Sequence, residues 1–532
     1  MGEFAAIDRS TTPPGIVVPR DYNAAVDFID RNLEEGRGEK IAVIDESGQH
    51  TYAQLADRVN QTGNALRDIG IQMEQRIAMC MLDTVDFPAV FFGSIKAGIV
   101  PVALNTLLTT ADYDYMLRDS RAVALIVSDA LLEKFRLILD SQPFLRTVIV
   151  AGRCENGEDA GFERLDTLRG AASDVLDAAA TTCDDVAFWL YSSGSTGAPK
   201  GAVHLQSDAI NTAELYGSQV LGITEEDIVF SAAKLFFAYG LGNAMTFPFH
   251  VGATTVLLAG RPTPESVLEQ VRSHDVSIFY GVPTLFGAIL ADPDNDKTRS
   301  STSLRICISA GEALPEDIAH RWVERFGVDI LDGLGSTEML HIFLSNAPSD
   351  ISYGTSGKAV PGYDLKIVDE EGEEAVDGEI GELLVRGPSS ASHYFNKRER
   401  SLDTFQGAWT RTGDKYIRRD DGYYVYCGRS DDMLKVSGQW VSPFEVESAL
   451  LAHESVLETA VVGHRDDDEL VKPKAFIILK EGVIANDAVA DELKGFVKDR
   501  LAPFKYPRWI DFVDELPKTA TGKIQRFKLR ES

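Results

Sequence analysis

Short apolar runs alternate with longer amphipathic stretches between about residues 22 and 340 of this 532-residue chain. The amphipathic stretch 51–70, for example, has the spacing of a helix with one buried face. The runs are mainly apolar and show no polar alternation, which is typical of parallel strands that are covered on both faces. The predicted strands are 77–82, 124–129, 147–152, 254–260, 277–282 and 305–311. This alternation predicts an α/β fold.

The pattern changes from about residue 355, where short strand-like segments alternate with acidic turns. It predicts a β-rich lobe over about 355–430. A final α/β region of about 100 residues is long enough to form a small domain. We therefore predict a large domain over 1–430, which includes the lobe, and a small mobile domain over 431–532.

The longest apolar stretch, residues 87–108, is interrupted by Lys96, Gly98 and Pro101. It predicts a core helix followed by a strand and argues against a membrane span. The net charge of −30 opposes binding to nucleic acid or to an anionic membrane. The five cysteines show no metal-ligand spacing and are odd in number, so reduced thiols in the cytoplasm are expected.

Residues 191–201 read YSSGSTGAPKG and follow an apolar run, 186–191, that predicts a buried strand. The glycines allow backbone N–H groups to converge, and the hydroxyl groups and Lys200 add donors and a positive charge. The spacing differs from that of a P-loop, because Gly201 stands where the P-loop hydroxyl belongs. The segment predicts a polyphosphate-binding loop; a flexible Ser/Gly linker is the alternative.

Two glycine-bearing segments end predicted strands. In DGLGSTE, 332–338, Thr337 is expected to bind a phosphate and Glu338 to ligate Mg²⁺. The alternative is a plain turn that leads into a helix capped by Ser336 and containing His341. SAGEALP, 309–315, predicts either a shelf for a nucleotide base or an ordinary strand-to-helix turn.

Three further segments carry charged residues with two possible roles each. Asp414 follows a glycine in a predicted turn, TRTGDKY, where a carboxylate suits ribose hydroxyls, although acidic turns are common. Asp431 lies in a charged linker, 428–447, that suits a hinge or merely a solvated loop. Lys523 lies in LPKTATGKIQR, which is either a basic tail or a lysine that neutralises charge near an α-phosphate.

The segment KLFFAYGLGN, 234–243, combines aromatic and small residues. Such a run packs in a core more often than it lines a site. The alternative is a flat apolar pocket for an aromatic or acyl group, with Phe236, Phe237 and Tyr239 as walls and His341 close by.

Together, in this order and over about residues 22–530, these motifs resemble the acyl- and aryl-CoA ligase family of adenylate-forming, AMP-binding enzymes. YSSGSTGAPKG is the most specific match. DGLGSTE resembles the family's YGxTE segment, with Leu334 at its aromatic position. KLFFAYGLGN and the segment after Glu338 resemble the benzoate–CoA ligase branch.

The resemblance assigns roles residue by residue. As catalytic residues it implies Lys523, Thr337, Glu338 and Lys200, with Glu338 the Mg²⁺ ligand and Asp431 the hinge. For ATP and coenzyme A it implies Ser192, Ser193, Gly194, Ser195, Thr196, Gly197, Lys200, Gly311, Glu312, Asp332, Gly333, Thr337, Asp414, Arg429 and, for pantetheine, Gly438. For the aryl acid it implies Phe237, Ala238, Tyr239, Tyr280 and His341.

The implied enzyme is an AMP-forming acid–thiol ligase that converts benzoate to benzoyl-CoA through an acyl-adenylate. It would use ATP, Mg²⁺ and coenzyme A as a monomer or homodimer, without nucleic acid or membrane. Three alternatives stay open: a ligase for 4-hydroxybenzoate or another substituted benzoate, an enzyme that loads a carrier protein, and a non-catalytic nucleotide-binding protein. Fold alone does not decide among them.

Overall fold

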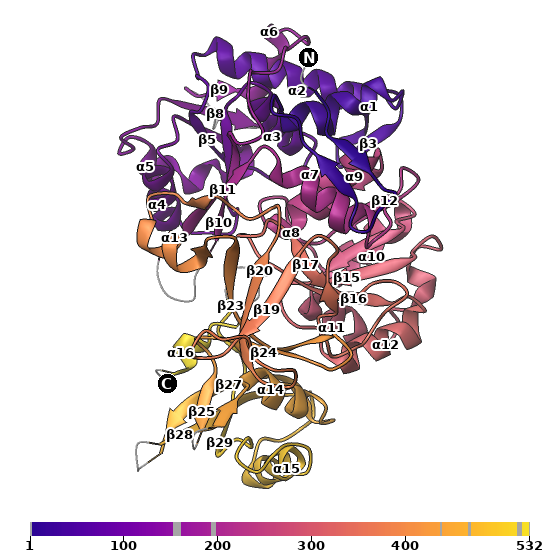
Figure 1. The fold of residues 1–532 in the computed structure, drawn as a ribbon, viewed down its shortest axis with the longest axis vertical. Helices are drawn as coiled ribbons and strands as arrows, with labels where there is room; N and C mark the ends of the chain where they lie inside the picture. The colour runs from indigo at the N-terminus through magenta and orange to yellow at the C-terminus, as the bar shows by residue number, and fades with distance from the viewer. Residues whose placement is uncertain are drawn as a thin grey trace.

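A computed structural model describes residues 3–152, 161–192, 198–436, 439–466, 470–518 and 524–530. Figure 1 shows the first half of the chain at the top, a strand-rich orange lobe in the middle and the C-terminal region at the bottom. The predicted α/β class is confirmed by this mixed architecture of a large N-terminal part and a smaller C-terminal one. The limits of the two domains and the mobility of the smaller one stay predictions.

An eight-stranded sheet of the described residues carries the predicted phosphate loop. Its strand order is β21(His393–Tyr394), β11(Lys200–Leu205), β10(Val186–Ser192), β6(Val100–Ala103), β5(Arg76–Cys80), β7(Ala124–Ser128), β8(Thr147–Ala151) and β9(Glu163–Arg164). The strands from β10 to β9 are parallel, whereas β11 and β21 run antiparallel to their neighbours. β5 and β7 are almost wholly buried, as their continuous apolar sequences require.

A nine-stranded sheet, again counted over the described chain, carries the predicted base and acid residues. Its order is β18(Lys358–Ala359), β17(Ile342–Ser345), β16(Ile330–Gly335), β15(Ile306–Ser309), β14(Ile278–Gly281), β12(Ile228–Ser231), β13(Thr254–Val256), β3(Ile41–Asp45) and β4(Gly48–Thr51). The central strands β16 to β3 are parallel, so their carboxyl ends meet at one edge. Ligands of α/β sheets bind at that edge.

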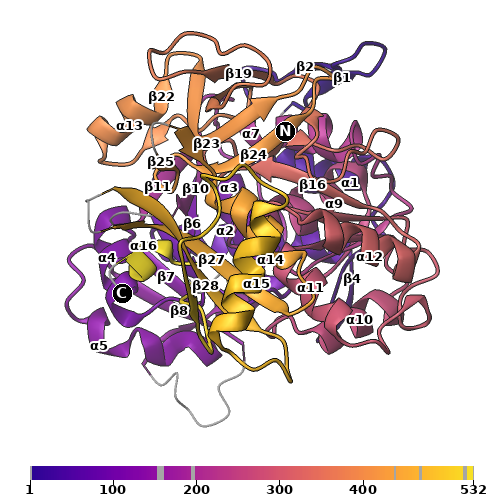
Figure 2. The same cartoon turned by 90° about the horizontal axis from the view of Figure 1, so that it is seen from below.

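The predicted β-rich lobe is an antiparallel sheet, and the described C-terminal residues form two smaller sheets, one of two strands and one of three strands that includes a parallel pair. The lobe contains β19(Asp364–Val368), β20(Gly381–Arg386), β22(Phe405–Gln406), β23(Trp409–Arg418) and β24(Tyr424–Arg429). The C-terminal strands are β25(Leu434–Val436), β26(Gln439–Val441), β27(Val456–Arg465), β28(Val471–Leu479) and β29(Trp509–Phe512). Figure 2 views this C-terminal region from below, with α14 and α15 in front of the larger sheets.

Helices cover the sheets, and a short hairpin of β1(Ala6–Asp8) and β2(Gly15–Val17) begins the described chain. The helices are α1(Arg31–Glu34), α2(Tyr52–Asp68), α3(Asp86–Lys96), α4(Thr110–Ser120), α5(Arg136–Leu139), α6(Leu165–Ala171), α7(Asp208–Thr212), α8(Ala238–Leu241), α9(Phe247–Val251), α10(Pro264–Ser273), α11(Pro283–Ala291), α12(Glu316–Phe326), α13(Arg398–Thr404), α14(Pro443–Leu451), α15(Asp487–Lys498) and α16(Arg526–Arg530). The π-helical turns are η1(Val26–Asp30), η3(Ala213–Ser218) and η4(Gly242–Thr246), and the 3₁₀ turns are η2(Asp129–Lys134) and η5(Lys297–Arg299).

Local sequence explains where α2 begins. Thr51 accepts a hydrogen bond from the Gln54 N–H, and the Gln54 side chain accepts one from the Thr51 N–H. This capping box satisfies two backbone donors at the start of α2. Within the described ranges, every helix is too short or too polar to cross a membrane.

The helix predicted after Glu338 is wrong. β16 and β17 are antiparallel, and residues 336–341 form the turn between them, with His341 immediately before β17. Ser336 does accept a hydrogen bond from the Met339 N–H at 3.1 Å, as a cap would. Leu340 then adopts φ +66°, which ends any helical path and returns the chain to the sheet.

The turn predicted around Asp414 is also wrong. Asp414 lies inside β23, which continues from Trp409 to Arg418. Gly413 has φ +74°, and the pairing with β20 shifts register at this point. The glycine therefore marks a bulge within a strand instead of a chain reversal.

Candidate active site

The predicted phosphate loop connects two strands of an antiparallel hairpin. Ser192, at the end of β10, lies directly opposite Lys200, at the start of β11. Ser193, Gly194, Ser195, Thr196 and Gly197 lie outside the described residues. The flanks of the loop are fixed to α4, because Tyr115 donates a hydrogen bond to the Pro199 carbonyl at 3.0 Å and Tyr191 donates one to Asp119 at 2.9 Å.

Glu338 lies beside both ends of this hairpin. Its Oε1 accepts hydrogen bonds from Ser192 Oγ at 3.0 Å and from the Tyr394 hydroxyl at 2.6 Å. The Lys200 Nζ lies 4.6 Å from the centre of the Tyr394 ring. Burial lowers the pKa of Lys200, and the nearby carboxylate of Glu338 opposes this effect. Three segments distant in sequence thus place a cation and a carboxylate around one point.

The surroundings of Glu338 suit a Mg²⁺ ion that takes one carboxylate ligand from the protein. Both hydrogen bonds fall on Oε1 of Glu338, so neither of them uses Oε2. Groups of three or more metal-ligating His, Cys, Asp or Glu side chains do not occur among the described residues. Mg²⁺ commonly takes one or two carboxylates together with substrate phosphates and waters, so a lone Glu338 is compatible with it.

A buried histidine supports the Glu338 turn, and sequence reasoning missed it. His204 of β11 is fully buried; its Nε2 donates to the Thr337 carbonyl at 2.8 Å, and its Nδ1 lies 2.8 Å from Asp208 Oδ2. This chain of contacts fixes the turn that carries Glu338 to the strand that begins with Lys200. The i, i+4 spacing of His204 and Asp208 could have predicted their contact. Nothing in the sequence around Tyr394 indicated that it would contact Glu338.

The predicted ribose residues face one another on two strands of the lobe. Asp414 of β23 and Arg429 of β24 are directly paired, and Arg429 Nη1 lies 3.1 Å from Asp414 Oδ1. The same nitrogen donates to the Thr412 carbonyl at 3.1 Å. Asp414 is buried, and its proximity raises the pKa of Arg429. The pair presents an oriented carboxylate, as ribose binding requires.

The predicted base-binding residues lie where β15 and β16 end. Asp332 pairs with Ser309 across these strands, Gly333 follows it, and Gly311 and Glu312 begin the turn that leads from β15 to α12. Within the described part of the chain, Oδ1 of the buried Asp332 has no hydrogen-bond partner. An unpaired buried acceptor is costly, and an exocyclic amine of a nucleotide base would satisfy it.

Replacing Asp332 with asparagine is expected to raise the melting temperature of the nucleotide-free protein by about 2 °C. Burial raises the pKa of Asp332 well above its usual range. The stability that the protonated group contributes is therefore present below its unfolded pKa and lost as the pH rises through the folded pKa. The melting temperature of the variant should therefore exceed that of the wild-type protein by more at about pH 8 than at about pH 5.

Thermal melting of the wild-type and Asp332→Asn proteins at both pH values checks this. Asp317→Asn, on the exposed face of α12, is the control and should change little. An advantage of the asparagine variant that shrinks as the pH rises would contradict the assignment of a buried, hard-to-ionise carboxyl.

The predicted acid-binding residues include a cluster of aromatic rings that contact one another edge-on or at a tilt. Tyr239 lies 5.7 Å from His341 and 6.3 Å from Tyr280, measured between ring centres. Tyr239 donates to the carbonyl groups of Gly281 and Ile308, both at 3.2 Å, which anchors it to the ends of β14 and β15. Ala238 begins α8 beside it. Phe237 precedes Ala238 and packs against Phe236 and the main core, with the two phenylalanine ring centres 4.4 Å apart.

His341 is neutral in this environment. Burial lowers its pKa to about 3, although the Tyr239 carbonyl opposes this effect. Its Nε2 donates toward the Tyr239 carbonyl and Asn243 Oδ1, both at 3.1 Å. Over the described residues, His341 Nδ1 and the Tyr280 hydroxyl are buried without partners. Apolar rings with a few unpaired polar atoms are typical of small-ligand sites.

The predicted hinge follows β24 directly. Asp431 lies in an exposed turn, 3.8 Å from Arg429. Its neighbour Asp432 pairs with Arg526 and Arg530 of the C-terminal region. Lys523 and Gly438 lie outside the described residues, so their predicted roles stay predictions.

Comparisons with known proteins agree over nearly the whole chain. The sequence model of the AMP-binding enzyme family matches residues 29–395, and that of the AMP-binding enzyme C-terminal domain matches residues 445–523. The chain is 59% identical over 534 residues to a benzoate–CoA ligase of Thauera aromatica, covering 100% of both chains. It is 51% identical over 513 residues to a 4-hydroxybenzoate–CoA/benzoate–CoA ligase of Rhodopseudomonas palustris, covering 96% of this chain and 94% of that one.

A solved structure of a benzoate CoA ligase from Burkholderia xenovorans LB400 superposes with a TM-score of 0.89 at 51% identity. The superposition covers 96% of this chain and 100% of that one. Sequence motifs, family models and three-dimensional structure thus lead to one assignment. The chain belongs to the AMP-binding enzyme family, and its resemblance to the benzoate–CoA ligase branch is confirmed.

Proposed function

We propose that this chain is an ATP-dependent benzoate–CoA ligase that forms benzoyl-adenylate and then benzoyl-CoA. The observation that carries the proposal is the turn between β16 and β17. It presents Glu338 to Ser192, Tyr394 and Lys200, and three residues later it presents His341 to Tyr239. A carboxylic acid held by the rings would therefore lie next to the phosphates of a nucleotide held at Glu338.

In the first step, a carboxylate oxygen of benzoate attacks the α-phosphorus of ATP, and pyrophosphate leaves. Lys200 and the hydroxyl groups of the loop hold the β- and γ-phosphates, and Asp414 holds the ribose. Mg²⁺, when bound at Glu338, neutralises phosphate charge. Lys523 bridges the carboxylate and the α-phosphate, where negative charge develops. Catalysis is then mainly positioning and charge stabilisation.

In the second step, the thiol of coenzyme A attacks the acyl carbon, AMP leaves, and the thiol proton is released. AMP is a far better leaving group than the oxygen of a free carboxylate, which is why the adenylate is made first. Lys523 cannot stay at the phosphate while the thiol enters, so residues 431–532 turn about Asp431 and pantetheine passes Gly438. No enzyme residue needs to be modified covalently.

A ligase for 4-hydroxybenzoate is the second candidate. The Tyr280 hydroxyl and His341 Nδ1 have no partner in the described chain, and a ring hydroxyl could pair with one of them. The 4-hydroxybenzoate–CoA/benzoate–CoA ligase of Rhodopseudomonas palustris, which is 51% identical to this chain, supports this candidate. A site that hydrogen-bonds a substrate hydroxyl discriminates strongly against an acid that lacks it.

Measuring kcat/KM over benzoate, its 2-, 3- and 4-hydroxy and amino derivatives, cyclohexanecarboxylate and a medium-chain fatty acid tests both candidates. Benzoate should exceed the non-aromatic acids by about tenfold or more, because the ring cluster favours a flat acid. Preference for 4-hydroxybenzoate would replace the first candidate with the second. Preference for the fatty acid would overturn both.

Product analysis separates the remaining alternatives. Benzoyl-CoA made with free coenzyme A distinguishes this function from loading of a carrier protein. Release of pyrophosphate on addition of benzoate and ATP distinguishes it from nucleotide binding without catalysis. The free thiols of Cys80, Cys183, Cys307 and Cys427 support action in the reducing cytoplasm.

A further inference from the structure

A fully buried carboxylate lies in the π-helical turn η3. The side chain of Glu214 is 0% exposed and accepts hydrogen bonds on both oxygens. Arg9 donates from Nε at 2.8 Å and from Nη2 at 2.7 Å, His250 Nε2 donates at 2.9 Å, and Gln219 donates at 2.8 Å. The two-pronged contact with Arg9 fixes direction as well as distance.

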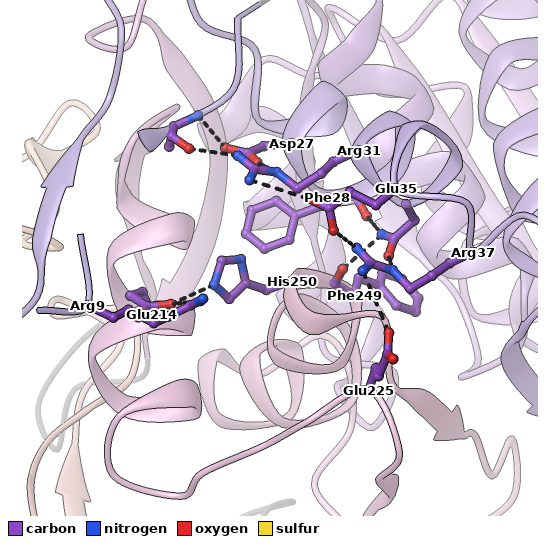
Figure 3. A network of polar contacts seen from close by, with 12 residues as sticks. Arg9, Asp27, Phe28, Arg31, Glu35, Arg37, Glu214, Glu225, Phe249 and His250 are labelled. Atoms are coloured by element: carbon purple, nitrogen blue, oxygen red, sulfur yellow. Dashed lines mark hydrogen bonds and ion pairs between the residues drawn. The ribbon is translucent and has the colours of Figure 1, made fainter. Parts of the chain in front are cut away.

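These donors come from segments far apart in the sequence. Arg9 follows β1 in the N-terminal hairpin, and His250 belongs to α9. Figure 3 shows both side chains converging on Glu214, with the Phe28 ring beside His250. Burial raises the pKa of Glu214, but the hydrogen bonds from His250 and Arg9 outweigh this and hold the pKa below its ordinary value. The group is therefore an anion that needs its donors.

Glu214 lies in η3 and its partner His250 lies in α9. These two segments also carry the rings that surround His341. Tyr216 is two residues further along η3, and its ring lies 5.5 Å from that of His341. Phe247, the first residue of α9, lies 4.4 Å from His341 and 6.0 Å from Tyr216. A Cβ atom at Gly217 would lie only 3.1 Å from Phe247, so η3 and α9 pack closely.

We propose that Glu214 is a positioning residue for the aryl-acid site. By holding Arg9 and His250, it fixes η3 against α9 and so sets the spacing of Tyr216 and Phe247 around His341. The N-terminal hairpin, through Arg9, thereby contributes to selection of the acid. This inference rests on the proposed function, because it concerns how that site chooses its acid.

The expected result for Glu214→Gln is a rise of about tenfold in the KM for benzoate, with the KM for ATP unchanged within about twofold. The preference for benzoate over cyclohexanecarboxylate, as a ratio of kcat/KM, should fall by about tenfold, since displaced rings no longer define a flat site. Arg9→Met should likewise raise the KM for benzoate and lower the preference for benzoate over cyclohexanecarboxylate. Arg9 is 55% exposed, so this second variant tests the idea with less risk to folding.

Asp86→Asn is the matched control. Asp86 of α3 accepts from Arg169 at 2.6 Å and from Arg58 at 3.3 Å, and these partners lie on α6 and α2. The control removes a comparable arginine–carboxylate contact that touches neither η3 nor α9. It should lower the melting temperature while leaving the acid preference as in the wild-type protein.

The inference is overturned if the Glu214 and Arg9 variants melt earlier yet keep the wild-type acid preference. It is also overturned if Asp86→Asn alters that preference as much as they do. If the wild-type protein forms no benzoyl-CoA, the proposed function is refuted instead. Melting curves and ATP binding then show whether that protein was folded.

Discussion

Replacing Lys523 with alanine should lower the rate of benzoyl-adenylate formation by about a thousandfold. The lysine is expected to bridge the attacking carboxylate and the α-phosphate, two anions that repel each other until a cation lies between them. Conversion of supplied benzoyl-AMP and coenzyme A to benzoyl-CoA should stay within about threefold of wild type, since that step develops no such charge at the lysine. Pyrophosphate release and thioester formation, assayed separately, measure the two steps.

Lys518→Ala is the control for this experiment. Lys518 lies five positions earlier in the same basic segment and pairs with Glu458 at 2.7 Å. Its removal should change either step by about twofold at most, as is usual for a partly exposed ion pair. Equal losses of both steps in Lys523→Ala would contradict the assigned role.

Replacing Glu338 with glutamine should lower adenylate formation by about a hundredfold. Glutamine keeps the size of the side chain and an oxygen that can accept from Ser192 and Tyr394. The turn should therefore keep its place while the negative charge is lost. The concentration of Mg²⁺ needed for half-maximal rate should rise, and a magnesium titration of pyrophosphate release measures it.

Tyr394→Phe separates charge from hydrogen bonding at this position. It removes one donor to Oε1 of Glu338 but leaves the carboxylate, so we expect a loss of less than about tenfold. A Glu338→Gln enzyme with a normal rate and a normal magnesium requirement would rule out Glu338 as the metal ligand.

The sequence alone predicted the α/β class and the buried parallel strands, because continuous apolar runs leave few other solutions. β5, β7, β8, β14 and β15 fall within the predicted ranges to one residue. Through the family resemblance it also placed Ser192 and Glu338 in one site, and their side chains are hydrogen-bonded; the other predicted site roles stay predictions. Local patterns failed where long-range pairing overrides a local signal, as at Ser336 and Gly413.

Partners from distant segments escaped prediction for a related reason. Tyr394 contacts Glu338 only because β21 joins the edge of β11. Glu214 gave no sign that it would be buried, since a glutamate is ordinarily exposed and its arginine partner is 205 positions away. Such contacts depend on how sheets and helices assemble, which a single sequence does not display.

The edge strand β21 has a consequence for how this chain matures on the ribosome. It covers the middle of the outer edge of β11, at Ala202 and Val203, yet it is synthesised nearly 200 residues later. At ordinary rates of translation that edge stays uncovered for about ten seconds or more. An uncovered strand edge can pair with a strand of another chain, so the nascent protein should be most prone to aggregate in this interval and should then depend most on chaperones.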